Sequence, residues 1–100
     1  MVVISDDILT EFKDRMRLGG GEDENLTRIL KASFEDLKEK CGDYSFEDIR
    51  FKELVFERSR YAYNDALEYF NVNFQSQINS LGFSKAIEVI PDESVQIHTS

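Results

Sequence analysis

The stretch from Phe51 to Phe70 has the pattern of one long helix with two apolar faces, and it constrains the fold more than any other feature. One stripe holds Phe51, Leu54, Val55, Tyr61, Ala62, Ala66 and Tyr69. A second stripe, roughly 130° around the helix, holds Phe56, Tyr63, Leu67 and Phe70. A surface helix of a small monomer needs only one apolar face. A helix with two is either the central rod of its domain or packs on a second chain.

Two helices are expected before this segment. Ser5 is a good N-cap for the first, whose apolar stripe ends before the glycines at 19–21. The second starts near residues 22–25 and stops at Gly42, with the stripe Leu26, Ile29, Leu30, Ser33, Phe34, Leu37 and Cys41. Ser45 and Asp48 then resemble a capping box, which leads into the long helix directly or through a short helical turn.

A shorter fourth helix is expected after a bend or break at Asn71 and Asn73, and it is closed by Gly82. Its apolar residues are Phe74, Ile78 and Leu81. The sequence therefore predicts an all-α fold, a small bundle of about four helices with one long central helix. Residues 1–83 are the expected helical domain.

The pattern changes after Gly82. Residues 86–90 favour extended structure, residues 91–94 favour a turn, and residues 95–97 alternate again. Residues 84–100 are therefore expected to be an extended, hairpin or frayed C-terminal segment. The apolar residues with which it could dock on a partner are Ile87, Val89, Ile90, Val95 and Ile97.

Charge and length exclude several classes of protein. One hundred residues suggest one domain, and a net charge of −8 without a basic cluster disfavours binding to phosphate backbones. No apolar run is long enough to span a membrane, and the first residues lack the features of a signal peptide. The single Cys41 favours a reducing cytoplasm.

Residues for catalysis are hard to find. His98 is the only histidine and lies in the last three residues, where chains usually fray. Cys41 lies on an apolar stripe near a helix C-terminus, which raises the pKa of a thiol and favours a packing role. No zinc, calcium or phosphate-loop pattern is complete. The sequence predicts a protein that is not an enzyme, with no cofactor and no metal.

Arg58 and Asp65 are charged residues on the first apolar stripe of the long helix. They are two turns apart and do not contact each other on one helix. Burying either without a partner is costly. Each therefore snorkels or finds a partner within the chain, or makes a salt bridge to a neighbouring subunit.

The order of these elements resembles a known family. A short capped helix, a glycine joint, an acidic-started helix and a second glycine precede a long helix that contains the run Arg60-Tyr61-Ala62-Tyr63-Asn64. Phe70, Phe74, Ile78 and the pair Leu81-Gly82 follow. Residues 5–82 are in this respect similar to the helical head–tail connector (adaptor, head completion) proteins of long-tailed phages and their prophage relatives.

The resemblance implies a structural subunit that forms a homo-oligomeric ring under the portal protein and extends the DNA channel. The ring docks the tail or a stopper protein, while DNA passes through without specific binding. Such a chain can stay monomeric in isolation, in the host bacterial cytoplasm, until it joins the virion. The candidate subunit interface is Phe56, Arg58, Tyr63, Asp65, Leu67 and Phe70.

The charge alone also fits a rival from another class, a small acidic cytoplasmic interaction protein. Such a protein could be a DNA mimic, an antitoxin or a regulator. No concentrated acidic run supports mimicry, so only the overall charge of the chain favours this alternative.

Overall fold

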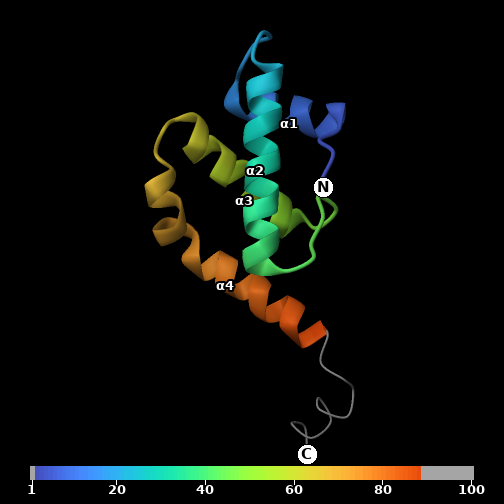
Figure 1. The fold of residues 1–100 in the computed structure, drawn as a ribbon, viewed down its shortest axis with the longest axis vertical. Coiled ribbons are helices and arrows are strands. Elements are labelled where there is room, and N and C mark those ends of the chain that lie inside the picture. The colour runs from blue at the N-terminus through green and yellow to red at the C-terminus, as the bar shows by residue number, and fades with distance from the viewer. Residues whose placement is uncertain (1, 89–100) are drawn as a thin grey trace, which may run out of the picture.

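The computed structural model describes residues 2–88, which form four α-helices and, within that range, no β-strand. The helices are α1 (Asp6–Met16), α2 (Asp23–Cys41), α3 (Ile49–Tyr63) and α4 (Phe70–Glu88), and a single 3₁₀ turn, η1 (Leu67–Tyr69), leads into α4. In Figure 1, α2 stands upright, α3 crosses it, and α4 passes its lower end. The predicted all-α class with four helices is confirmed.

The helix starts follow from capping side chains. The Ser5 hydroxyl accepts from the Ile8 N–H at 3.2 Å, as predicted for the N-cap of α1. The predicted capping box before α3 is wrong in register, because Asp48 itself is the N-cap. Its carboxylate accepts from the N–H groups of Arg50 and Phe51 at 2.9 and 3.2 Å. Ser45 instead closes a local turn, accepting from the Glu47 N–H.

The expected helix over 51–70 is shorter in the structure, because α3 ends at Tyr63. Asp65 adopts a left-handed conformation with φ 57°. The Ala66 N–H then donates to the Tyr61 carbonyl at 2.8 Å, and the Asp65 N–H donates to the Ala62 carbonyl at 3.1 Å. This pair of bonds is a Schellman ending with aspartate in the position that glycine usually takes. The chain therefore turns at 64–66, earlier than the expected break at Asn71 and Asn73.

The fourth helix differs from expectation at both ends. It starts at Phe70, bends at Phe74 (φ −119°, ψ 17°) and continues through Gly82 to Glu88. Gly82 does not terminate α4 and lies beside the end of α2, where an added Cβ would be 3.4 Å from the Lys40 carbonyl oxygen. Residues 84–88 are thus helical instead of extended, and residues 89–100 lie outside the described residues.

The core is aromatic and lies on both sides of α3. Phe51 is fully buried, with its ring edge-on to Phe34 at 5.3 Å and stacked on Tyr44 at 5.4 Å. Phe56 is also fully buried and meets Phe12 of α1 at 5.5 Å. Each such ring contributes on the order of 2 kcal/mol through burial. The two apolar faces predicted for this segment are therefore partly satisfied inside one chain.

Candidate assembly surface

Two of the six predicted interface residues belong to the core of the chain itself. Phe56 is 0% exposed and Phe70 is 1% exposed. The Phe70 ring stacks on Phe74 at 5.1 Å and lies edge-on to Tyr61 at 5.7 Å. Burial at this level leaves neither ring with surface for a second chain, so the second apolar stripe is divided between core and surface.

Arg58 and Tyr63 have partners within the chain. Arg58 donates to the Asp36 carboxylate and to the Ser33 hydroxyl, both at 3.1 Å, which joins α3 to α2. The Tyr63 hydroxyl donates to the Glu22 carboxylate at 2.7 Å, and this bond raises the pKa of Tyr63. Of the two alternatives for Arg58, the partner inside the chain is therefore the one that the structure shows.

The other predicted residues are on the surface or outside the described range. Asp65 is exposed at the left-handed end of α3, and Leu67 is 37% exposed in η1. Ile87 is 44% exposed on the last turn of α4. Val89, Ile90, Val95 and Ile97 lie outside the described residues.

Several exposed apolar side chains were not predicted as surface residues. They are Ile49, Tyr69, Val72 and Phe83, all more than half exposed. Phe83 lies just beyond Gly82, where the fourth helix was expected to end, so no helix face was predicted for it. Once α4 is extended, Phe83 lies about 200° around the helix from buried Leu81, on its outer side.

A cleft of about 620 Å³ lies between α3 and α4. Its wall includes Ile49, Leu54, Phe74, Gln77, Ser80 and Leu81, with Arg15 and Arg50 also contributing. The volume falls in the range of clefts that take a ligand or a few side chains of another chain. Phe74, at which α4 bends, is one of the lining residues.

Ion pairs fix α1 beside the cleft. Arg15 of α1 donates to both carboxylate oxygens of Glu53 and lies 3.5 Å from Glu57. The hydrogen bond from Arg15 lowers the pKa of Glu53. The Arg15 guanidinium also lies 5.5 Å from the centre of the Phe56 ring. These contacts hold α1 against α3, although the pairs are partly exposed and each contributes little by itself.

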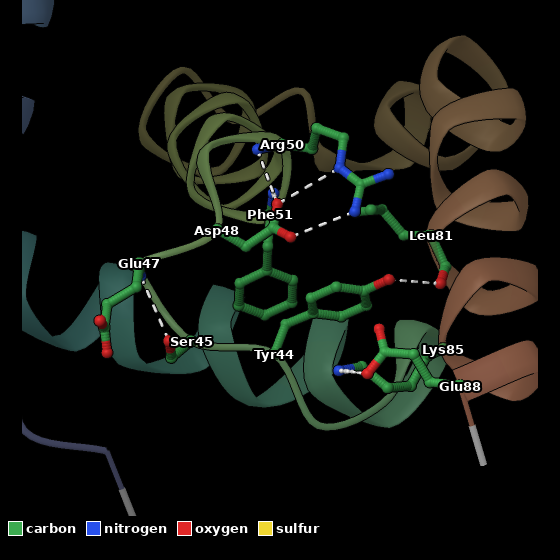
Figure 2. A network of polar contacts seen from close by, with 9 residues as sticks. All are labelled: Tyr44, Ser45, Glu47, Asp48, Arg50, Phe51, Leu81, Lys85 and Glu88. Atoms are coloured by element: carbon green, nitrogen blue, oxygen red, sulfur yellow. Dashed lines mark hydrogen bonds and ion pairs between the residues drawn. The ribbon is translucent and has the colours of Figure 1, made fainter.

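A second network joins the loop before α3 to α4 (Figure 2). The Tyr44 hydroxyl donates to the Leu81 carbonyl at 2.7 Å, and the Lys85 ammonium lies 4.4 Å from the centre of the Tyr44 ring. Lys85 also pairs with Glu88 at 3.2 Å, and Arg50 donates to Asp48 at 3.1 Å. The network anchors the C-terminal half of α4 through Leu81 and Lys85.

The Asp48 cap gives a pH-dependent prediction. Hydrogen bonding from the Arg50 side chain lowers the pKa of Asp48, with help from the backbone N–H groups of Phe51 and Arg50. Because the pKa of Asp48 is lower in the folded chain than in the unfolded chain, the ionised cap stabilises the fold fully above the unfolded-state pKa of about 4. That stabilisation is lost as the pH falls through the folded-state pKa. Asp48→Ala is expected to destabilise the chain by about 1 kcal/mol at pH 7.

Urea titrations at neutral pH and at a pH of about 2.5 check this, since protonation weakens the cap in the wild type only. The difference between wild type and Asp48→Ala should shrink at the lower pH. Glu47→Ala, an exposed neighbour, is the matched control and should behave like wild type at both. A difference that stays constant with pH would show that the carboxylate charge plays no part in the cap.

The described residues offer little to catalysis. Cys41 is buried, and desolvation raises the pKa of its thiol, which disfavours the nucleophilic thiolate. Within residues 2–88 no three His, Cys, Asp or Glu side chains gather as a metal site, and none of the helices found there is long and apolar enough to cross a membrane. His98 lies outside that range.

Comparisons of the chain with protein-family models, with curated proteins and with solved structures found no match.

Proposed function

We propose that this chain is a structural subunit of a phage or prophage head–tail connector. In this proposal identical copies form a ring under the portal protein, extend the DNA channel and dock the tail or a stopper protein. The proposal starts from the resemblance of residues 5–82 to that family. The observation that carries it further is the distribution of exposed apolar residues over η1 and α4.

Five of the seven large apolar side chains that are exposed among the described residues lie between residues 67 and 88. They are Leu67, Tyr69, Val72, Phe83 and Ile87, and the other two are Val3 and Ile49. Single exposed apolar residues need no explanation, but a concentration on one helix and its lead-in turn is typical of a protein interface. The surface supports assembly better than it supports chemistry on a small molecule.

The charge fits the same role. With 12 basic and 20 acidic residues the chain repels DNA phosphates, which suits a channel through which DNA passes without binding. A ring of identical copies also needs two different contact patches on each chain, because every contact is heterologous. In this proposal the exposed side of η1 and α4 and the cleft beside α4 serve as the two patches.

Genetic complementation tests the proposal. In a phage or prophage that encodes this chain, its deletion should give DNA-filled heads that lack tails. Wild-type chain supplied in trans should restore infectious particles, and Leu67→Asp should not, because a charge at a desolvated contact opposes assembly. The variant should still fold, since Leu67 is partly exposed in η1.

Glu68→Ala is the matched control, because Glu68 is an exposed neighbour in the same turn. It should complement like wild type, and circular dichroism should show native helix content for both variants. Tailed, infectious particles from the deletion strain would contradict the connector role. If the deletion instead released a DNA-binding protein from inhibition, the chain would belong to the class of acidic interaction proteins.

A further inference from the structure

The last two turns of α4 carry an apolar pair on their outer side. Phe83 and Ile87 are one helical turn apart, and they are 68% and 44% exposed. Leu81 and Ile78, which face the core, lie on roughly the opposite side of the helix. A phenylalanine and an isoleucine in adjacent turns are the side chains with which a helix anchors itself in an apolar groove.

The α3–α4 cleft has the shape and the polarity to receive such a pair. Leu54, Phe74 and Leu81 supply apolar wall, Ile49 is an exposed apolar residue at one side, and Gln77 and Ser80 are the small or neutral polar residues of the opposite side. A volume of about 620 Å³ can hold a phenylalanine and an isoleucine side chain together. Arg15, Arg50, Glu53 and Glu57 also line the cleft. Arg15 pairs with both glutamates and Arg50 pairs with Asp48, so each of these charges has a partner within the chain.

We infer that Phe83 and Ile87 of one copy seat in the α3–α4 cleft of a second copy, so that copies join head to tail. This contact rests on the proposed connector function and identifies the surfaces that would join neighbouring subunits of the ring. The pair and the cleft lie at successive positions along one helix. Because the pair and the cleft are different surfaces, a contact that uses one of them from each copy can repeat from copy to copy, as a ring requires.

Charge complementarity supports a second copy as the occupant. The Glu88 side chain, at the end of the apolar pair, is 60% exposed, and the Arg50 side chain, at the cleft, is 59% exposed. Within one chain Glu88 pairs with Lys85 and Arg50 pairs with Asp48, and the Glu88 charge also attracts Arg50 of the same chain. Exposed pairs of this kind exchange partners at little cost, so Glu88 of one copy can pair with Arg50 of the next.

The same chain cannot fill its own cleft with this pair. Gln77 and Ile87 are ten residues apart in α4, which separates their Cα atoms by about 15 Å in a helix. A disulfide needs Cα atoms within about 7 Å. Cysteines at these two positions can therefore bridge only between chains, which gives a direct test.

The test uses the full-length double variant Gln77→Cys/Ile87→Cys at about 1 mM, where contacts with millimolar Kd are populated. Air oxidation should give a ladder of dimers, trimers and longer species on a non-reducing gel, and a reducing agent should remove it. Each single variant can give at most a dimer. The wild type should stay monomeric, because its only thiol, Cys41, is buried with a raised pKa.

Adding Phe83→Asp to the double variant should lower the trimer and longer species by at least about tenfold, which corresponds to ~1.4 kcal/mol of contact. Val3→Asp is the matched control, because Val3 is an exposed apolar residue at the other end of the chain. It should leave the ladder unchanged. Circular dichroism should show native helix content both in the double variant with Phe83→Asp and in the double variant with Val3→Asp.

Three results would overturn the inference: no bridged species, dimers only, or a ladder that Phe83→Asp leaves intact. Dimers only would indicate a two-fold contact, and an insensitive ladder would indicate random collision. The outcome is independent of the complementation test. If the bridged ladder forms but the deletion strain still makes infectious particles, the contact between copies stands and the connector function is wrong. If the chain complements the deletion but no ladder forms, the connector function stands and its subunit contact lies elsewhere.

Discussion

Phe51→Ala is expected to be the most damaging single substitution in the chain. The ring is fully buried and contacts Phe34 and Tyr44, so its removal leaves a cavity between α2, α3 and the loop before α3. Phenylalanine-to-alanine changes in cores destabilise by about 3–5 kcal/mol. Because the free energy of unfolding of a small domain is only about 5–15 kcal/mol, this substitution removes a large part of it.

Thermal unfolding followed by circular dichroism measures the effect, and Tm should fall by roughly 15–30 °C. Tyr69→Ala is the matched control, since Tyr69 is an aromatic residue that is 59% exposed. The Tyr69→Ala substitution should lower the free energy of unfolding by no more than about 0.5 kcal/mol. Similar Tm values for the two variants would show that the aromatic cluster around Phe51 is not the centre of the core.

Gly42→Ala is expected to have the second-largest effect. Gly42 follows α2 with φ 111° and ψ −169°, a backbone conformation that is nearly restricted to glycine. An added Cβ would also lie 2.5 Å from Cγ of Lys85. Lys85 would have to leave the Tyr44 ring, which weakens the attachment of α4. The expected destabilisation is about 1–3 kcal/mol.

Urea unfolding of Gly42→Ala, Lys85→Ala and the double variant separates the two causes. If backbone strain dominates, the double variant should be destabilised by about the sum of the single variants. If the clash dominates, removing Lys85 should relieve most of the effect of the added Cβ. Gly20→Ala is the control, because nothing lies near a Cβ at Gly20. A Gly42→Ala chain as stable as this control would contradict the account.

The helix starts and apolar stripes were largely predictable from sequence, because they depend on local chemistry. Ser5 caps α1 through its own side chain, and the spacing of Leu26, Leu30, Phe34 and Leu37 places them on one buried face. These features need no knowledge of distant residues. The all-α class follows from them, and it is the part of the prediction that the structure confirms.

The helix ends were harder to predict, because the same residue can serve two purposes. Gly82 has the chemistry of a terminator, yet it lies inside α4, which continues to Glu88 and passes beside the Lys40 carbonyl. Asp65 lacks the obvious signal of a helix end, yet it takes the left-handed position that stops α3. Which role applies depends on the packing of α2, α3 and α4, and a single sequence does not state that packing.

The assembly surface was predicted only in part for a related reason. The two apolar faces of residues 51–70 were visible, but the division between core and surface depends on where α1 and α4 pack. Phe12 covers Phe56, and Phe74 and Tyr61 cover Phe70, while Leu67 stays partly exposed. The bend at Phe74 lies next to the bend or break that was predicted at Asn71 and Asn73, but the cleft that Phe74 lines had no sequence signal.

The connector function has one most direct test, the mass of the complex that this chain forms with the portal protein encoded by the same genome. Purified portal rings are mixed with excess chain, and native mass spectrometry gives the number of copies bound. The proposal predicts a closed ring with one fixed number of copies on each portal ring, with few partly filled species, because neighbouring copies stabilise one another. Portal rings that bind no chain, or only scattered single copies, would contradict it.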